Sequence, residues 1–569
     1  MGLQLINSDS LIDIEKHFKI TAGPGAGKTK FLISHIKNVL HNSNRLGRNR
    51  KIACITYTNV GVETIVQRLG DELDHVEVST IHSFLFMHIV KPYLYLISDK
   101  HGINHLKIDA PYEHIISNGY FRKTDLGMKN IKEQDMKKVF WFIEGTSCKL
   151  HIRGRKSDFH KSLLKYKKMF WEKGIIHYED VLAFAWEILN SSKEILRIIR
   201  SKFPYFFIDE FQDTNPVQTE IIKLIAEKET IVGVIGDKAQ SIYEFQGADV
   251  KQFDNFFLPG MASYKMEDNH RSTENIIKLL NVIRKDIIQR SPDNKVGSTP
   301  CIIVGEPLQA LKHVQDVVGE EEVVTLSYSN LMANSVRNKK DYKDGQKWML
   351  IDEAFVDSNA DRRKVIISII KAIEYARLNH FKDAIRELSR HLRNKDDYNG
   401  QKSAIDFIRM MLNDYSTYSD EPLWKLYCRV KETGYFDIPK IMESKGEKAP
   451  SLIEDYYKST IYSGIALSVK ITEDSSLHRT IHKAKGSEFN NVMVIVKGKD
   501  GYKYNEERDL GFLLDPDING NEDHRVNYVA CSRAKKNLFI CVPEISKVSQ
   551  NALMGRCIVI NLHDLRSQT

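Results

Sequence analysis

The sequence predicts an α/β protein of more than one domain. Three observations lead to this prediction. A glycine-rich turn joins a short apolar strand to an amphipathic helix, a second apolar strand ends in two adjacent carboxylates, and the chain has 569 residues. That length is more than one ordinary domain needs and leaves room for about three to five.

Composition excludes several classes of protein. Hydrophobic residues make up 42% of the chain and charged residues 28%, as in soluble globular proteins. No stretch approaches the ~18 consecutive apolar residues of a membrane span, and the N-terminus lacks the layout of a secretory signal. Seven cysteines are scattered without a CxxC pair. We therefore expect a cytoplasmic protein without membrane association, disulfide framework or zinc ribbon.

Positive charge is concentrated in one segment. The whole chain has a formal net charge of +8, and residues 121–170 hold fourteen Lys or Arg against five Asp or Glu. Aromatic residues interleave with these cations: Tyr120, Phe121, Phe140, Trp141, Phe159, Tyr166, Phe170 and Trp171. Phosphates attract cations and unpaired bases stack on rings, so the segment is a candidate nucleic-acid surface. A solvated basic face over a core stripe such as Leu163, Tyr166 and Phe170 fits the same composition.

A phosphate-binding loop is predicted after the strand at residues 18–21. The octet AGPGAGKT comprises Ala22, Gly23, Pro24, Gly25, Ala26, Gly27, Lys28 and Thr29, and a helix with Leu32, Ile36 and Val39 on one face follows it. Glycines let successive amides point at phosphate oxygens, and the helix N-terminus adds its positive end. Lys28 would reach the β- and γ-phosphates, and the Thr29 hydroxyl would help to hold Mg²⁺. Alone, the octet could also be a chance turn before a helix.

An acidic pair supplies the second half of a nucleotide-hydrolysing site. The apolar strand at residues 205–208 ends in Asp209 and Glu210. Asp209 at the strand tip suits a second Mg²⁺ contact, and Glu210 can take a proton from an attacking water. Phosphate loop and acidic pair together predict an NTPase that uses Mg²⁺; that its nucleotide is ATP is what the family resemblance given next implies.

Ordered sequence blocks along nearly the whole chain resemble the superfamily 1 DNA helicases of the UvrD/Rep/PcrA type. After the phosphate loop, residues 55–69 resemble motif Ia and residues 80–84 motif Ib. DEFQD at 209–213 is similar to motif II, residues 234–248 to motif III and residues 267–273 to motif IV. Residues 480–495 and 526–538 resemble motifs V and VI. One block would be weak evidence, whereas the full set in order is specific.

The resemblance implies roles for further residues of the nucleotide site. Gln212 and Gln240 would lie near the γ-phosphate, and Glu488 would bind the ribose. Arg271 and Arg533 would act on the transferring phosphate as arginine fingers. His270 stands where the family has a tyrosine that stacks on adenine, and Lys30 replaces an arginine after the loop. Adenine selectivity is the property that these departures put in question.

The resemblance also implies a path for single-stranded DNA. Tyr57, Tyr243 and Phe245 match aromatics that stack on bases, which lets a motor ignore sequence. Thr56, Asn59, His82, Thr480 and His482 match contacts to the DNA backbone. Phe245 could equally belong to the core.

The motif spacing and the resemblance imply two RecA-like P-loop lobes, 1A and 2A, each a parallel sheet flanked by helices. Each lobe would be interrupted by a mainly helical insert, 1B in the first and 2B in the second. Lobe 1A would comprise residues 1–91 and 175–270, around insert 1B at 92–174. Lobe 2A would comprise 271–343 and 465–569, around a short, helical insert 2B at 344–464. In that insert Ile366, Ile369, Ile370 and Ile373 share one helix face, as do Ile405, Ile408 and Leu412. After Arg533 only 36 residues remain, so no fused nuclease domain is expected.

We therefore expect an ATP-dependent translocase and helicase on single-stranded DNA and single-strand/duplex junctions, moving 3′ to 5′ by resemblance. The alternative is a DNA-end-sensing ATPase subunit that activates a partner nuclease, with little unwinding of its own. By size and layout it would be similar to the helicase-like subunit of the Gabija anti-phage system. An RNA helicase is a third hypothesis, because phosphate and stacking contacts do not distinguish the sugars unless the 2′-OH is read. The motif set favours DNA.

Overall fold

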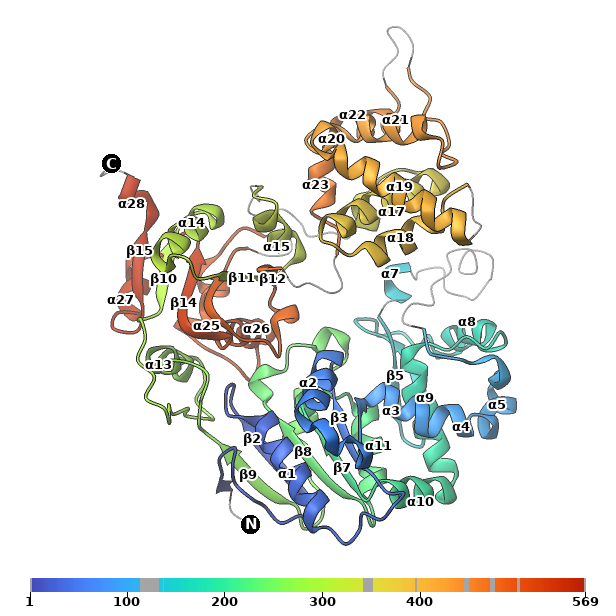
Figure 1. Ribbon diagram of the computed structural model, residues 1–569, viewed down its shortest axis with the longest axis vertical. Coiled ribbons are helices and arrows are strands. Elements are labelled where there is room, and N and C mark those ends of the chain that lie inside the picture. The colour runs from blue at the N-terminus through green and yellow to red at the C-terminus, as the bar shows by residue number, and fades with distance from the viewer. Residues whose placement is uncertain are drawn as a thin grey trace. The chain divides into compact units, whose positions relative to one another are not determined.

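The computed structural model describes residues 3–112, 133–136, 138–340, 351–393, 397–444, 450–470, 476–498 and 502–566. The chain forms two compact units. The first comprises Met1–Gly297 and Pro516–Ser532, and the second comprises Ser298–Asp515 and Arg533–Thr569. Figure 1 shows both as helices around a sheet. Within the described residues, no helix combines the length and the apolar character that a membrane span requires.

A seven-stranded parallel sheet forms the centre of the first unit. Its strand order is β1-β9-β2-β8-β7-β3-β4. The strands are β1 Gln4–Leu5, β2 Phe18–Ala22, β3 Ile52–Thr56, β4 Val76–Thr80, β7 Tyr205–Ile208, β8 Ile231–Gly236 and β9 Ala262–Met266. The predicted strands at residues 18–21 and 205–208 are confirmed as β2 and β7.

Alternation along the strands buries both faces of this sheet. In β7, Tyr205 and Phe207 join the core under α1 (Lys28–Asn42) and α2 (Asn59–Leu69), whereas Phe206 and Ile208 join the core on the opposite face. Successive side chains of a strand point to opposite faces, so a continuous apolar run is what a sheet covered on both sides requires. The other helices of the first unit are α3 Ile81–Leu85, α4 Lys91–Tyr93, α5 Tyr95–His101, α7 Glu133–Met136, α8 His160–Trp171, α9 Tyr178–Ser191, α10 Lys193–Lys202, α11 Pro216–Ala226, α12 Val250–Asn255, α13 Glu274–Ile283 and α26 Glu522–Cys531.

The first insert includes an antiparallel hairpin that the sequence analysis did not anticipate. Its strands are β5 (Val139–Glu144) and β6 (Ser147–Ile152), and Trp141 lies opposite Leu150. The aromatics Trp141, Tyr166, Phe170 and Trp171 are buried in the same continuous core as the lobe helices α9 and α11. The stripe Leu163, Tyr166 and Phe170 is thus packing, as its spacing suggested. Tyr120 and Phe121 of the basic segment lie outside the described residues.

A six-stranded parallel sheet forms the second unit, in the order β12-β11-β13-β14-β10-β15. The strands are β10 Cys301–Val304, β11 Val323–Ser327, β12 His478–Thr480, β13 Phe489–Ile495, β14 Ala534–Val542 and β15 Ile558–Asn561. One face packs on α14 (Pro307–Val318), α15 (Asn330–Arg337) and α28 (Leu562–Arg566). Short helices α24 (Glu506–Asp509), α25 (Gly511–Leu514) and α27 (Lys547–Ala552) complete this unit. Two parallel sheets flanked by helices confirm the predicted fold class.

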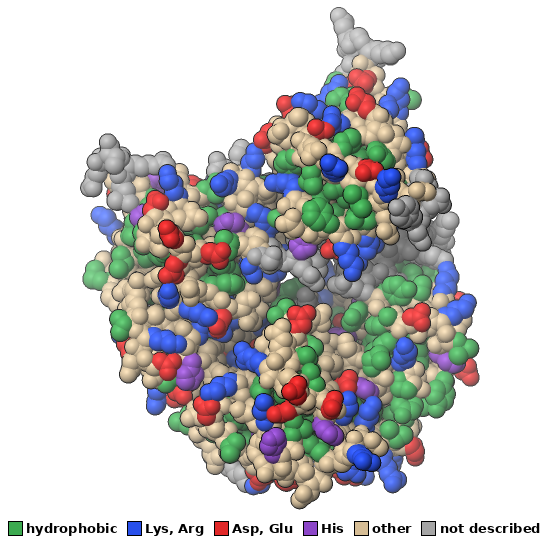
Figure 2. All heavy atoms as spheres, in the orientation of Figure 1, with side chains coloured by type: hydrophobic (Ala, Val, Ile, Leu, Met, Phe, Trp, Pro, Cys, Tyr) green, Lys and Arg blue, Asp and Glu red, His purple; other side chains and the backbone are tan. Residues whose placement is uncertain are grey.

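The second insert forms a helical bundle with its own core. Its helices are α16 Ile351–Ala354, α17 Ala360–Arg377, α18 Phe381–Ser389, α19 Asp397–Asn413, α20 Tyr415–Tyr418, α21 Leu423–Thr433, α22 Leu452–Ser459 and α23 Tyr462–Ala466. The isoleucine face of α17 is buried, as predicted. Ile405 is instead 50% exposed, because α19 turns Ala404, Phe407 and Ile408 inward. Lys and Arg alternate with Asp and Glu over the bundle surface (Figure 2). The predicted start of this insert at residue 344 lies outside the described residues.

Candidate active site

Three neighbouring strands of the first sheet deliver the candidate catalytic groups to one edge. Strand β8 lies between β2 and β7, and all three run parallel. The phosphate loop follows β2, Asp237 follows β8, and Asp209 follows β7. Carboxyl ends of parallel strands meet at the same edge, which is where open α/β sheets bind their ligands.

The phosphate loop turns through two glycines in the left-handed region. Gly25 has φ 72° and Gly27 has φ 82°, and Gly27 is the residue that precedes α1. Lys28 begins α1, and its ammonium donates to the carbonyl oxygen of Gly23 at 3.2 Å, so it lies over the loop. Amides at a helix N-terminus together with a lysine form an anion site. This is the arrangement that the octet predicts.

Two residues that the sequence analysis did not select hold the loop from outside. The Gln289 side-chain amide donates to the Pro24 carbonyl at 3.1 Å, and Asn269 accepts from Arg271 N at 3.0 Å. A Cβ added to Gly23 would lie 2.2 Å from Gln289 Nε2, and one added to Gly25 would lie 2.3 Å from Asn269 Oδ1. Close packing therefore disfavours a side chain at both positions, and at Gly25 the left-handed backbone disfavours one as well.

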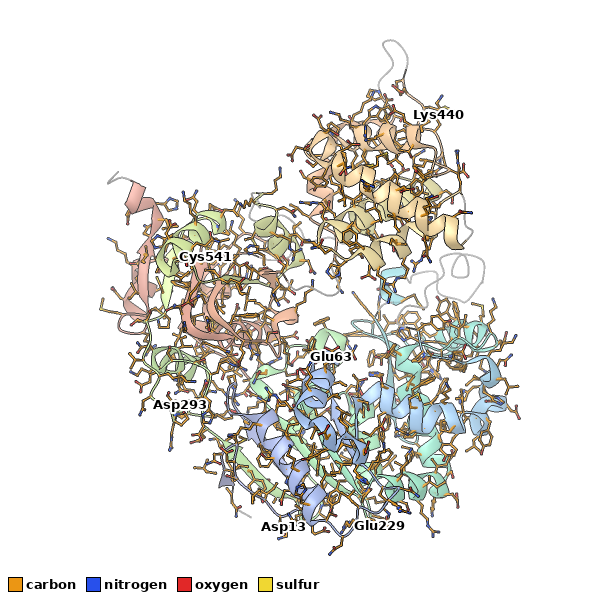
Figure 3. The ribbon with its side chains drawn as sticks, in the orientation of Figure 1. Asp13, Glu63, Glu229, Asp293, Lys440 and Cys541 are labelled. Carbon is orange, nitrogen blue, oxygen red and sulfur yellow. The ribbon has the colours of Figure 1, made fainter. Side chains whose placement is uncertain are left out.

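His270 and Arg271, from the block resembling motif IV, lie beside the loop. The backbone N–H of His270 donates to the Gly25 carbonyl at 3.0 Å, and its ring lies 3.5 Å from the Asp293 carboxylate. Asp293 is labelled in Figure 3. Arg271 Nη1 donates to the Ser532 carbonyl at 2.9 Å. Lys30 pairs with Asp9 at 2.6 Å.

The candidate base Glu210 is held in an unusual backbone conformation. Its φ is 55°, a region that residues with a side chain seldom adopt. The side-chain amide of Gln212 donates to its carboxylate, while Gln212 Oε1 accepts from Asp237 N at 2.9 Å. Gln212 is fully buried, so its orientation is fixed from both ends. A strained residue with a supported side chain is typical of functional sites.

Asp237 connects this strand end to a buried arginine. Its carboxylate accepts from Gln240 Nε2 at 2.6 Å and pairs with Arg284 Nη1 at 2.6 Å. Asp237 and Arg284 are both buried. Arg284 also faces the ring of Tyr528 at 5.9 Å in α26. The network Glu210–Gln212–Asp237–Arg284 therefore links the candidate base to a helix distant in sequence.

The oxygen ligands at this edge fit a magnesium ion carried by a nucleotide. Thr29 lies in the first turn of α1 and Asp209 at the tip of β7, and hydroxyl and carboxylate oxygens are the ligands that Mg²⁺ prefers. Among the described residues, no group of three or more His, Cys, Asp or Glu could form a metal cage. Magnesium bound with a nucleotide takes most of its ligands from phosphate and water, so two protein ligands suffice.

An aromatic row lies next to the site, in the blocks that resemble motifs Ia and III. Tyr57 and Tyr243 stack with their ring centroids 5.2 Å apart and the planes inclined by 24°. Tyr243 lies 6.1 Å from Phe245, which is 57% exposed and therefore not a core residue. Burial raises the pKa of both tyrosines, so both hydroxyls stay neutral at physiological pH. Such rings can stack on bases without reading sequence.

Three predicted contacts to the DNA backbone lie in the first unit and differ in exposure. Asn59 is exposed at the start of α2, whereas Thr56 is buried. Thr56 packs closely on Gly61, because a Cβ added to that glycine would lie 2.5 Å from the Thr56 hydroxyl. His82 lies edge-on to Tyr178 at 5.4 Å. Burial lowers the pKa of His82 to about 4, so this ring is neutral at pH 7.

Four predicted site residues belong to the second unit. The buried Arg533 Nη1 lies 3.3 Å from the Ser487 carbonyl oxygen, to which it donates. Glu488 pairs with Lys535 at 2.6 Å. Thr480 is buried in β12, and His482 lies 6.0 Å from Tyr328, which the sequence analysis did not select.

Two of the residues that the sequence analysis did not select could have been found from their position in a motif block. Asn269 and Asp237 fall inside the blocks resembling motifs IV and III, so their positions mark them as candidates. Gln289 and Arg284 fall in no block. Only the packing of α13 and the segment after it brings them to the loop and to Asp237.

The fold and the site together define a P-loop nucleotide hydrolase. Comparison with known proteins gives the family. The description "UvrD/REP helicase N-terminal domain" matches residues 7–257, and "UvrD-like helicase C-terminal domain" matches residues 309–544. The chain belongs to the UvrD/REP helicase family, an enzyme family of ATP-dependent DNA helicases.

Individual relatives agree with this assignment. A probable DNA helicase II homolog of Rickettsia conorii is 24% identical over 95% of this chain and 92% of its own. The ATP-dependent DNA helicase PcrA of Staphylococcus aureus is 23% identical over 94% of this chain and 82% of its own. Among solved structures, an arterivirus helicase, nonstructural protein 10, has a TM-score of 0.28 at 11% identity over 94% of this chain and 61% of that one. That structural similarity is too low to bear on the fold.

Proposed function

We propose that this protein is a motor that moves along single-stranded DNA, 3′ to 5′, by hydrolysing ATP between its two lobes. The convergence of phosphate loop, Asp237 and the Asp209–Glu210 pair at the ends of three adjacent strands carries the proposal. The polarity follows from the family resemblance. Magnesium, when bound with the nucleotide, would neutralise charge on the phosphate oxygens.

The candidate site residues of the two units support a specific division of work. Lys28 and the loop amides bind the phosphates. Glu210 takes the proton of the attacking water, and Gln212 positions its carboxylate through the bond described above. Arg271 and Arg533 stabilise charge on the transferring phosphoryl group, and Glu488 binds the ribose. His270 lies beside the loop where it can contact the base of the nucleotide.

DNA binding is assigned to the aromatic row and to residues of both units. Tyr57, Tyr243 and Phe245 stack on unpaired bases. Asn59, His82, Thr480 and His482 contact the phosphodiester backbone, and Thr56 supports them from a buried position. The motor lobes use ATP to alternate their grip on the strand.

ATPase measurements with and without single-stranded DNA test the proposal. We expect DNA to raise the turnover of the wild-type protein. Lys28→Ala, Glu210→Gln and Arg533→Ala should each lower turnover at least about 100-fold, because each removes a group that acts on the transferring phosphate. Lys16→Ala and Glu220→Gln, exposed side chains of the first unit, serve as matched controls. Turnover that ignores DNA, or that survives in Glu210→Gln, would refute the proposal.

A strand-displacement assay on tailed duplexes distinguishes the proposed motor from the alternative, a DNA-end-sensing ATPase subunit. A helicase of the expected polarity releases a strand from a duplex with a 3′ tail and not from one with a 5′ tail. DNA-stimulated ATPase without strand displacement on either substrate would instead favour an end-sensing ATPase subunit. Equal stimulation by single-stranded RNA would favour the RNA hypothesis.

A further inference from the structure

A buried arginine of the first unit lies outside all of the motif blocks. Arg284 follows the last residue of α13, and its side chain is 1% exposed. Burying a guanidinium is costly unless it is paired, and an interior ion pair often does no more than offset that cost. The proposed division of work gives Arg284 no part in hydrolysis. The contacts of this side chain indicate what the buried charge does.

Two carboxylates hold the guanidinium of Arg284. Its Nη1 lies 2.6 Å from Asp237 Oδ1. Its Nε donates to Asp286 Oδ1 at 2.8 Å, and its Nη2 donates to Asp286 Oδ2 at 3.2 Å. Asp237 is fully buried, whereas the Asp286 side chain is 33% exposed. A planar guanidinium holds two carboxylates in fixed directions at once, whereas the ammonium of a lysine is a compact point charge.

Asp237 passes this orientation on to two glutamines. Its second carboxylate oxygen, Oδ2, accepts from Gln240 Nε2 at 2.6 Å. Its backbone N–H donates to Gln212 Oε1 at 2.9 Å. Because that oxygen accepts from a backbone N–H, the other end of the Gln212 amide must be the NH₂ group, and this group donates to the Glu210 carboxylate. The bonds therefore run without a break from Arg284 to the candidate base.

Negative charge is concentrated at this edge of the sheet. Asp209 and Glu210 follow β7, and Asp237 follows the neighbouring strand β8. A buried carboxylate is strongly destabilising unless a cation pairs with it. Arg284 supplies that cation to Asp237, so this carboxylate can accept from Gln240 in one fixed orientation.

A further contact connects Arg284 to the helix α26. The guanidinium lies 5.9 Å from the centre of the Tyr528 ring, which is fully buried. Helix α26 packs against α13 and against the turn after β8. It ends just before Ser532, whose carbonyl accepts from Arg271, and Arg533 is the next residue of the chain. One side chain thus contacts both the strand end that holds the base and the helix that precedes a proposed arginine finger.

We propose that Arg284 is a positioning residue for ATP hydrolysis. It fixes Asp237, and through Asp237 it keeps Glu210 aimed at the attacking water and Gln240 at the γ-phosphate. This inference rests on the proposed function, because these two groups act on a nucleotide only if the protein hydrolyses it. Binding of the nucleotide belongs to Lys28 and the loop amides. Loss of Arg284 should therefore appear in kcat and hardly in the KM for ATP.

Steady-state ATPase measurements on Arg284→Lys, with saturating oligothymidylate, test the proposal. Lysine keeps the positive charge but cannot hold Asp237 and Asp286 in the two directions that the guanidinium fixes. We expect kcat to fall about 10- to 30-fold while the KM for ATP changes less than about threefold, because the reacting groups are misplaced and the phosphate loop is intact.

Arg362→Lys is the matched control, because the second insert contains a similar buried pair. Arg362 Nε donates to Asp357 Oδ2 at 2.6 Å, and its Nη2 donates to Asp357 Oδ1 at 2.8 Å. The same substitution should lower the midpoint of thermal unfolding there and change kcat less than about twofold, because this pair belongs to the separate core of the insert.

A double variant separates positioning from simple neutralisation of charge. Arg284→Met with Asp237→Asn removes both charges, so neither is left buried and unpaired. This protein should fold and bind ATP with nearly the wild-type KM, and its kcat should stay at least about 10-fold low, because nothing then fixes the side chain at position 237.

The outcomes are distinguishable from failure of the proposed function. A wild type without ATPase activity would refute the proposed function and this role with it. An active wild type with unchanged kcat in Arg284→Lys would overturn the positioning role alone. Recovery of wild-type kcat in the double variant would overturn it as well, since Arg284 would then only neutralise Asp237. A fall in kcat matched by an equal rise in KM would also contradict it, because the nucleotide site as a whole would then be disturbed.

Discussion

The two inserts are joined to their lobes in opposite ways. In the first unit one hydrophobic core runs from the sheet, through α9 and α11, into Trp141, Leu163 and Trp171 of the insert. In the second unit the insert has a core of its own, around Ile370, Phe407 and Tyr462, and the sheet has another. Each insert is a segment inserted into a parallel sheet. The same connectivity therefore gives one insert that shares the core of its lobe and one that has a separate core.

The junction of the second insert is polar and contains a cavity. Asn334 of α15 donates to the carbonyls of Leu467 at 2.8 Å and Val469 at 2.9 Å, and Arg377 of α17 donates to Asn338 at 3.1 Å. A cavity of about 90 Å³ is lined by Asn334, Asn338, Arg377 and Val469. Loosely packed polar contacts resist displacement less than a continuous core does. The comparison teaches that the first insert is built as part of the lobe and the second as an attachment.

Removing one buried ring from each of the two cores should give the largest difference between the inserts. Trp171→Ala and Phe407→Ala each remove a fully buried ring, at a cost of about 3–5 kcal/mol in unfolding free energy. Trp171→Ala should lower the transition of the lobe and the thermal stability of the ATPase together. Phe407→Ala should unfold the second insert in a separate, earlier transition. Urea unfolding followed by circular dichroism and by ATPase activity distinguishes the two, and one shared transition in both variants would contradict the comparison.

Two buried carboxylates, one in each unit, allow a second pair of substitutions with a smaller expected loss of stability. Asp180 accepts from Trp141 at 3.0 Å, from Trp171 at 2.9 Å and from Lys167 at 2.7 Å. Asp357 accepts from Arg362 at 2.6 Å and from Tyr457 at 2.8 Å in the second insert. Asp180→Asn and Asp357→Asn should each cost about 3 kcal/mol, because a buried cation loses its counter-charge.

The location of the loss is the informative result of this second pair. Asp180→Asn should destabilise the lobe, and Asp357→Asn the second insert alone, as measured by the same urea transitions. Asp158→Asn, an exposed carboxylate near the hairpin, controls for removing charge without burial. A lobe transition unchanged in Asp180→Asn would show that the first insert is not part of the lobe core.

Asn334→Ala tests whether the hydrogen bonds of this side chain stabilise the polar junction. Two buried carbonyls lose their donor, so the cost should be about 1–2 kcal/mol and confined to the junction. Hydrogen exchange measured by mass spectrometry should become faster across residues 462–470 and stay unchanged in the first unit. Asn413→Ala, an exposed position on α19, is the matched control. Equal protection in both variants would indicate that the junction does not depend on these bonds.

The smallest expected effect concerns pH. Burial raises the pKa of Glu179 at the start of α9 to about 7, opposed by Lys167 and Arg153. Above pH 7 this carboxylate is ionised near Tyr57, and below pH 7 it is neutral. When the pH falls from 8 to 6, protonation removes this negative charge, which repels the phosphates of DNA. The affinity of the wild type for single-stranded DNA should therefore rise about threefold more than that of Glu179→Gln.

A buried glutamate of the second insert is the control for this pH effect. Burial also raises the pKa of Glu374, which bonds Tyr462 and Arg377 inside the second unit. Glu374→Gln should leave the pH dependence of DNA affinity as in the wild type, because this group lies among the residues of the second insert. If both variants lose the pH dependence, the effect does not come from Glu179. Anisotropy titrations at fixed ionic strength measure both.

Local patterns were enough to predict two strands at the centre of the first lobe. The apolar runs at β2 and β7 are continuous because both faces of a parallel sheet are covered, and such runs are visible in sequence. The loop glycines and the acidic pair were predictable because phosphate chemistry demands those residue types in that order. The hairpin β5–β6 was missed, since its outward face carries Phe140 and Phe142 and hides the alternation of a half-buried strand. The exposed Ile405 was misassigned because a one-residue shift of the helix face depends on packing.

The sequence by itself determined the chemistry of this protein: a phosphate loop, an acidic pair and an ordered set of helicase motifs. Tertiary structure alone decided which residues support that chemistry. Gln289 reaches the loop, and Arg284 reaches Asp237, from a segment more than 45 residues beyond β8. It also decided that one insert shares the core of its lobe and the other does not. Chemistry needs particular atoms in a local order, which sequence records, whereas the continuity of a core depends on which apolar faces meet in space.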